Sequence, residues 1–237
     1  MRPVTRREFL GVAAAGSLTV AGLTVVAVGR DSAVAGTVGT RPTKLTIGST
    51  TTTMVDGTRI PAWSYSPGAG IGVPGPVLWA VQGEVVELTV SNELTSARGF
   101  AIPGVVDSGP IRPGGSATVR FIAPAAGSYL YLDPVGAPIG RMMGLQGAFL
   151  VMPATGFSPY TTPTPALSNL FSDLGDPTQL GGKQWIPDRQ WIWLFNQVDP
   201  ALAQRVASGA TVTPAEFTSQ FAPRYFTING KSGFFAA

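Results

Sequence analysis

Short alternating segments between glycine and proline turns constrain this chain more than any other feature of its sequence. Segments in which apolar and polar residues alternate lie at 44–47, 84–90, 116–122, 127–132 and 147–152. Every second side chain of a strand faces the same side, so this period predicts strands with one buried face. Strands repeated roughly every ten residues between such turns predict an all-β sandwich or barrel.

The composition agrees with an all-β fold. The chain has 30 glycines and 21 prolines, and only 12% of its residues are charged. Its 44% of hydrophobic residues is enough for a sizeable core. Cysteine is absent, so neither a disulfide nor a thiolate ligand is available.

The composition changes after residue 153. A Pro/Thr-rich linker is predicted at 154–188, followed by a strand at 190–198 and by another strand and turn at 225–230. Between these strands, short helices are expected at 200–207 and 214–221.

Two or three strands cannot bury a sandwich face by themselves. The sequence therefore predicts one complete domain at 44–153 and the incomplete start of a second at 189–237.

The first 35 residues are predicted to be a twin-arginine export signal. Arg6 and Arg7 precede an apolar stretch at 9–28, and Ala33-Val34-Ala35 forms a cleavage pattern that ends at Ala35. An uncleaved membrane anchor is the other interpretation. Cleavage would leave a flexible lead at 36–43 and a mature chain with 12 basic and 11 acidic residues. That balance argues against a nucleic-acid partner and predicts a periplasmic, cell-wall or extracellular protein.

Four segments, in this order, resemble the first domain of a multicopper oxidase. They are 74–94, with Pro-Gly-Pro-Val and Val-Ser-Asn-Glu-Leu; 110–124, with a proline-glycine turn; 127–131, Gly-Ser-Tyr-Leu-Tyr; and 143–148, Met-Gly-Leu-Gln-Gly-Ala. Residues 223–231 resemble the early part of a second domain of the same kind. The resemblance implies a cupredoxin-like Greek-key β-sandwich, with copper as the cofactor of the family.

The family's copper ligands are missing from this chain, which has no histidine. The resemblance implies one His-x-His pair at Ala101 and Pro103, and a second pair at Leu132 and Pro134. A further histidine of the family corresponds to Gln146.

Copper centres of these kinds need imidazole or thiolate donors. We expect the methionines left after the signal (Met54, Met142, Met143 and Met152) to fill gaps in the core rather than to bind Cu(I). The sequence therefore predicts no catalytic residue, no metal site and no cofactor for this chain alone.

Other candidate residues have simpler structural roles. Asp107, Asp133 and Asp188 could serve acid–base chemistry or bind Ca²⁺, but their spacing favours loop and turn roles. Asp133 is the best candidate, because it lies where the ligand loop of the family leaves its strand. Trp191 and Trp193 share one side of a predicted strand. They could form an interface or a carbohydrate platform, although packing against the first domain is the plainer interpretation.

Three hypotheses for function remain open. The first is an exported copper-free member of the family that acts as a structural or interaction module, with a β-domain partner or self-association through 189–237. The second is the front portion of an oxidoreductase whose remaining ligands lie in a downstream segment or a partner chain. The third is a truncated product without a selected function.

Overall fold

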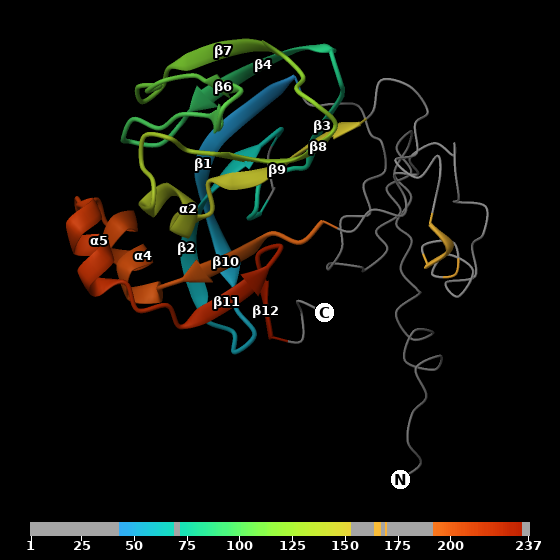
Figure 1. The fold of residues 1–237 in the computed structure, drawn as a ribbon. Helices are drawn as coiled ribbons and strands as arrows, with labels where there is room; N and C mark the ends of the chain where they lie inside the picture. Colours follow the sequence, from blue (N-terminus) through green and yellow to red (C-terminus); the bar gives the residue numbers. More distant parts are fainter. Residues whose placement is uncertain (1–42, 69–71, 153–163, 167–168, 170–191, 234–237) are drawn as a thin grey trace, which may run out of the picture.

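The structure is a computed structural model that describes residues 43–68, 72–152, 164–166, 169 and 192–233 of the 237-residue chain. Residues 43–152 form a sandwich of two sheets (Figure 1). The first sheet has the order β2 (Arg59–Ser66), β1 (Lys44–Thr53), β4 (Val85–Asn92) and β7 (Ser116–Ile122). The second has the order β3 (Leu78–Val81), β9 (Gln146–Met152), β8 (Gly127–Leu132), β5 (Ala101–Ile102) and β6 (Val106–Asp107).

The chain crosses repeatedly between the two sheets, as in a Greek key. Alternation along β4 shows which side of the first sheet faces the core. Val86, Leu88 and Val90 are buried, whereas Val85 and Glu87 are exposed. In the antiparallel pair with β7, Val86 lies opposite Phe121 and buries a second large side chain beside it. The all-β Greek-key sandwich predicted from the sequence is confirmed.

The alternating pattern identified several strands and missed others. The alternating segments at 84–90, 116–122 and 127–132 are strands in the structure, whereas β2 was not predicted. Trp63, Ser64 and Tyr65 are all buried in consecutive positions of β2. The helix α4 (Pro200–Ala207) contacts β2 from outside the sandwich, so both faces of this strand are covered and no alternation remains.

Residues 192–233, called here the C-terminal segment, form a separate sheet. It has the order β10 (Phe195–Val198), β11 (Tyr225–Ile228) and β12 (Lys231–Ser232). The two predicted helices are confirmed as α4 and α5 (Pro214–Gln220), and both have a side-chain cap. Asp199 accepts a hydrogen bond from the Leu202 N–H at 3.0 Å. The predicted strand at 190–198 starts only at Phe195 among the described residues.

One side of the C-terminal segment docks on the sandwich, so that β10, β11 and β12 lie beside α2 (Ile139–Met143) and β2 (Figure 1). The Tyr225 hydroxyl donates to the Asp56 carboxylate at 2.6 Å, and the Val55 N–H donates to the Ser232 hydroxyl at 2.8 Å. The Asn196 amide donates to the Arg141 carbonyl at 3.1 Å. These bonds join segments that lie far apart in the sequence.

Several predicted features lie outside the described residues. They include the export signal with Arg6, Arg7 and Ala35, the lead apart from its last residue, and most of the 154–188 linker. None of the helices in the described part of the chain is both long and apolar enough to span a membrane.

Candidate functional site

The structure brings three of the five missing-ligand positions into one row. Ala101 on β5 lies opposite Leu132 on β8, and Leu132 lies opposite Gln146 on β9. Ala101 and Gln146 are buried, and Leu132 is half-buried. The Gln146 side-chain oxygen accepts a hydrogen bond from Arg141 Nε at 3.2 Å. Three of the positions that the resemblance assigns to copper ligands thus lie on adjacent strands.

The two prolines do not join that row. Pro103 follows the end of β5, and Pro134 follows the end of β8. Because β5 and β8 are antiparallel, residues beyond these two ends lie on opposite sides of the row. Alanine and leucine side chains have no lone pair to donate, and the Gln146 side-chain oxygen is a hard amide donor already bonded to Arg141. Without an imidazole or thiolate, the side chains in the row do not fit copper.

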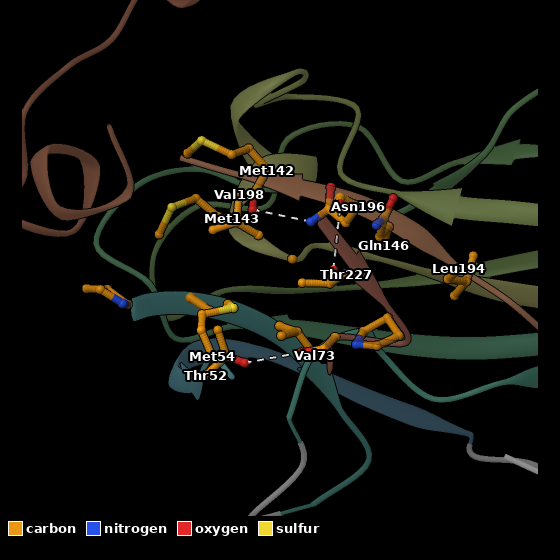
Figure 2. Close-up of a pocket in the computed structure, with 15 residues that line it drawn as sticks. Thr52, Met54, Val73, Met142, Met143, Gln146, Leu194, Asn196, Val198 and Thr227 are labelled. Carbon is orange, nitrogen blue, oxygen red and sulfur yellow. Dashed lines mark hydrogen bonds between the residues drawn. The ribbon is translucent and has the colours of Figure 1, made fainter. Parts of the chain in front are cut away.

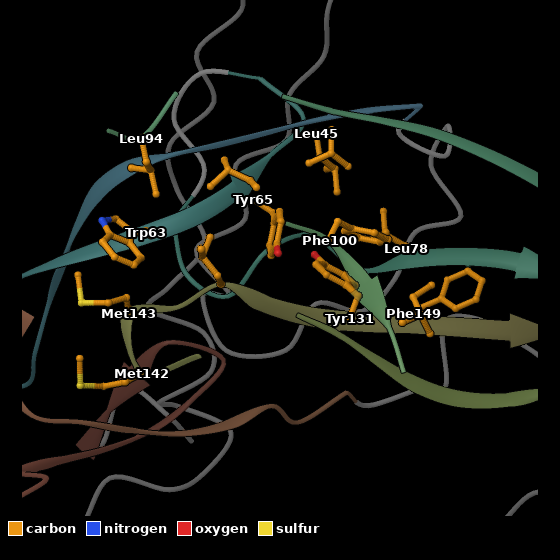
Figure 3. Close-up of a cluster of buried hydrophobic side chains, with 14 of the residues drawn as sticks. Leu45, Trp63, Tyr65, Leu78, Leu94, Phe100, Tyr131, Met142, Met143 and Phe149 are labelled. Atoms are coloured by element: carbon orange, nitrogen blue, oxygen red, sulfur yellow. The ribbon is translucent and has the colours of Figure 1, made fainter. Parts of the chain in front are cut away.

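An aromatic cluster fills the sandwich next to the row. Tyr65, Phe100 and Tyr131 are fully buried and lie beside one another (Figure 3). The Phe100 and Tyr131 rings are stacked at 5.3 Å, and Tyr65 meets Tyr131 edge to face at 5.3 Å. The Tyr131 hydroxyl donates to the Pro76 carbonyl at 2.6 Å, and burial raises the pKa of Tyr131 well above its ordinary value. A side chain at Gly147 would overlap the Tyr131 phenol, so this glycine is needed here.

Asp133 follows the row directly and is fully buried. Its carboxylate accepts hydrogen bonds from the backbone N–H groups of Gly99 at 2.9 Å, Val135 at 3.1 Å and Gly136 at 3.1 Å. Burial raises the pKa of Asp133, while these donors and the nearby Arg98 oppose the shift. The prediction of a loop role for Asp133 agrees with these bonds, because they hold the loop in place.

Arg98 supplies the counter-charge for Asp133. Its Nη1 lies 3.6 Å from Asp133 Oδ2, and its guanidinium carbon lies 4.3 Å from the centre of the Trp63 ring. A side chain at Gly136 would overlap Nη1, so the guanidinium occupies space that only glycine leaves free. Burial lowers the pKa of Arg98, and the Asp133 charge opposes that shift. A buried ion pair thus lies where the ligand loop of the family is expected.

Three of the four candidate methionines line one narrow pocket between the sandwich and the C-terminal segment. Met54, Met142 and Met143 are all buried, and they meet Asn196 and Gln146 around a cavity of about 20 Å³ (Figure 2). Flexible thioethers fill irregular gaps of this kind. The structure therefore agrees with a packing role for these methionines.

The remaining candidates have local roles. The exposed Asp107 accepts a hydrogen bond from the Gly109 N–H at 2.7 Å and closes a turn, as predicted. Asp188 and Trp191 lie outside the described residues. Packing of Trp193 against the sandwich was the wrong prediction, because its side chain is 62% exposed. The reason is that the docked side of the C-terminal segment is the other one, which carries Val198 and Tyr225.

Arg98 and Trp63 were missed by the sequence analysis. Neither belongs to an alternating segment or to a motif of the family. The one available signal was an isolated arginine beside Gly99-Phe100 in an apolar region. Only the fold shows that Arg98 reaches Asp133, which lies 35 positions along the chain.

Comparisons with known proteins agree with this geometry. Residues 49–156 match the family model described as multicopper oxidase. A curated copper-containing nitrite reductase from Alcaligenes xylosoxydans xylosoxydans is 30% identical over 111 residues, which cover 43% of this chain and 32% of that protein. The chain thus matches about a third of the length of this relative.

Two similar solved structures come from Nitrosomonas europaea. One is a blue copper oxidase, with 20% identity and a TM-score of 0.58 over 79% of this chain and 52% of that chain. The other is a copper nitrite reductase, with 18% identity and a TM-score of 0.54 over 79% of this chain and 55% of that chain. At these identities the structures establish the fold. The chain therefore has a cupredoxin-like fold, and residues 49–156 match the multicopper oxidase family.

Proposed function

We propose that this protein is an exported, copper-free cupredoxin-fold protein that acts as a structural or interaction module. One observation carries the interaction role: the outer side of the C-terminal sheet exposes large aromatic side chains. A second observation supports the absence of copper, because the row of Ala101, Leu132 and Gln146 carries no imidazole or thiolate.

The copper-free part of the proposal has a direct test. We expect less than one copper ion per chain after copper loading, desalting and metal analysis. A variant with Met54, Met142 and Met143 all changed to leucine is the matched control for Cu(I) held by thioethers. One or more tightly held copper ions per wild-type chain would overturn this part of the proposal, and loss of that copper in the variant would assign it to the methionine pocket.

The proposed interaction surface, called here the outer aromatic face, consists of Trp193, Phe195, Phe226 and Ile228. Trp193 is 62% exposed, and Phe195 and Phe226 are each 64% exposed. Phe195 lies opposite Ile228 across β10 and β11, and Phe226 occupies the next outward position of β11. None of these four residues is charged, and the exposed Gln197, which lies opposite Phe226, adds one polar amide to the same side.

A groove of about 530 Å³ extends the outer aromatic face towards the helices. Phe217 of α5 and Phe221, which follows the end of α5, line this groove. Their rings are stacked with centroids 4.6 Å apart. Leaving this much apolar surface in water costs about 25 cal/mol per Å². The four residues of the face carry no charge, so the face itself can pack against the same face of a second copy without charge repulsion, with Arg141 at the groove beside it. We infer that a second copy of the chain covers it.

The test measures mass in solution by light scattering over a range of protein concentrations. We expect concentration-dependent dimers of the wild-type protein and monomers of a variant with Phe195→Ser and Phe226→Ser. Ile122→Ser is the matched control, because Ile122 is 66% exposed on β7 of the sandwich. Dimerisation through the outer aromatic face is contradicted if the wild-type protein remains monomeric. It is also contradicted if the Ile122→Ser variant loses the dimer equally. Co-migration only with another β-domain protein would assign the face to that partner.

Export rests on residues 1–35. Twin-arginine recognition depends on the planar guanidinium groups of Arg6 and Arg7, which lysine lacks. We expect a variant with Arg6→Lys and Arg7→Lys to accumulate as unprocessed precursor in cells. Normal cleavage near Ala35 would show that another route exports the chain.

The front portion of a copper-dependent oxidoreductase is the second candidate. It is favoured by one observation: this chain covers only 52% and 55% of the two Nitrosomonas europaea structures. The missing copper ligands would then come from a downstream segment or a partner chain. The coding DNA after Ala237 tests this idea. A continuation that encodes His-Cys-His supports it, and a stop codon without such a continuation in any frame contradicts it.

A further inference from the structure

A second pocket lies on a different part of the molecule. It has a volume of about 570 Å³ and is formed by the loop 93–98, the segment 135–139 and the turn after α4, residues 207–212. It shares no residue with the groove beside the outer aromatic face. Its size is that of a site for a small organic molecule, and such sites form preferentially where two units of a fold meet.

Arg98 is the one cation among the residues that line this pocket. Its Nη1 lies 3.6 Å from Asp133, which is longer than a hydrogen bond. Its Nε is the only buried side-chain nitrogen or oxygen in the described part of the chain without a hydrogen-bond partner. The guanidinium therefore has donors to spare in a partly desolvated place.

Asp133 already accepts three backbone N–H groups, which leaves about one of its four lone-pair sites for the five N–H donors of Arg98. A buried charged group whose donors lack acceptors costs free energy. The exposed 13% of the Arg98 side chain is available to a ligand, because Arg98 lines the pocket. A carboxylate is the acceptor that best matches a guanidinium.

The rest of the pocket sets the shape and charge of the ligand. Its apolar lining includes Trp63, Leu94, Ile139 and Val212. An apolar body would contact these side chains. Glu93 is exposed and lines the same pocket, so a second carboxylate on the ligand would meet a like charge.

We propose that this pocket binds a small organic monocarboxylate with an apolar body, whose carboxylate accepts hydrogen bonds from Arg98. The site is independent of the outer aromatic face, so its failure would leave the proposed function untouched. Four probes test it as two matched pairs: benzoate with benzamide, and indole-3-acetate with indole-3-acetamide. Calorimetry and ligand-observed NMR measure their binding to the purified chain.

The expected result is that at least one carboxylate binds about tenfold or more tightly than its amide. Arg98→Gln should remove this preference, whereas Arg120→Gln on β7 should keep it, because Arg120 is exposed and does not line the pocket. Since Arg98→Gln leaves Asp133 without its counter-charge, Ala210→Trp is the second variant. It places a large ring at an exposed lining position and should block binding without touching the ion pair.

Three results would overturn the proposal. The first is that neither carboxylate binds. The second is that carboxylates and amides bind equally well. The third is that Ala210→Trp, folded as judged by its unfolding curve, binds the carboxylate as the wild-type chain does.

Discussion

The sandwich and the C-terminal segment use the same kinds of residues with different results. In the sandwich, Phe149 is 1% exposed and contacts Phe121 and Tyr129. In the C-terminal segment, Phe226 is 64% exposed, although it too lies on a strand with a buried neighbour, Tyr225. The difference is the number of layers: the sandwich has a second sheet to cover each inner face, and the three-stranded sheet has cover on one side only.

The ion pair inside the sandwich differs from the one that joins the two regions. Arg98 and Asp133 are almost entirely withdrawn from water, at 13% and 0% side-chain exposure. Arg224 and Asp56 lie 3.3 Å apart at 67% and 37% exposure. Buried charges are costly when one partner is removed, whereas exposed pairs contribute little. The contrast leads to four predictions about stability.

The largest effect is expected for core aromatics. Phe149→Ala should lower the free energy of unfolding by about 3–5 kcal/mol, because it leaves a cavity between the sheets. Phe226→Ala should change it by about 0.5 kcal/mol or less, because that ring is already in contact with water. Denaturant unfolding of dilute protein measures both. Equal losses would show that the outer aromatic face is covered within one chain.

The next effect concerns the ion pairs. Asp133→Ala should cost about 3 kcal/mol or more, because it leaves Arg98 and three backbone N–H groups without their acceptor. Arg224→Met should cost about 1 kcal/mol or less, because Arg224 is largely exposed. The same unfolding experiment compares them. If Arg224→Met proved as damaging as Asp133→Ala, the docking contact would be stronger than its exposure indicates.

The smallest effect is a difference in pH dependence. The Tyr225 hydroxyl, with Thr58 and Arg224, lowers the pKa of Asp56 from 3.8 to about 2. A carboxyl with a lowered pKa stabilises the fold above pH 4, and this contribution is lost as the pH falls from about 4 to about 2. Tyr225→Phe removes the largest cause, so stability should fall less steeply over that range. Unfolding curves at several acidic pH values measure the slope, and an unchanged slope would contradict the role of Tyr225.

Asp133 should act in the opposite direction. Its pKa is raised by burial, so the folded state binds its proton more readily than the unfolded state does. Its contribution therefore decreases as the pH rises through the raised pKa. Asp133→Asn removes that titration without removing the side chain. Unfolding curves of this variant therefore separate the contribution of Asp133 to the pH dependence of stability from that of Asp56.

Several local features could be predicted from the sequence alone. The alternation in β4 and β7 follows from a period of two residues, and the helices expected at 200–207 and 214–221 are α4 and α5. The register that placed Ala101, Leu132 and Gln146 as ligand positions came from the resemblance to the family, and the structure puts these three residues on adjacent strands.

The unpredicted features depend on contacts between distant segments. β2 was missed because α4 covers its outer face and removes its alternation. The exposure of Trp193 was missed because a single strand does not say which of its two faces finds cover.

The sequence by itself determined that this protein is built from short strands and that the family's histidine and cysteine ligands are absent. Both follow from local composition and order. The tertiary structure decided that Arg98 stacks on Trp63 beside Asp133, and which aromatic rings remain in water. Those outcomes depend on which surfaces meet when the chain closes on itself, and such long-range contacts leave no periodic mark in the sequence.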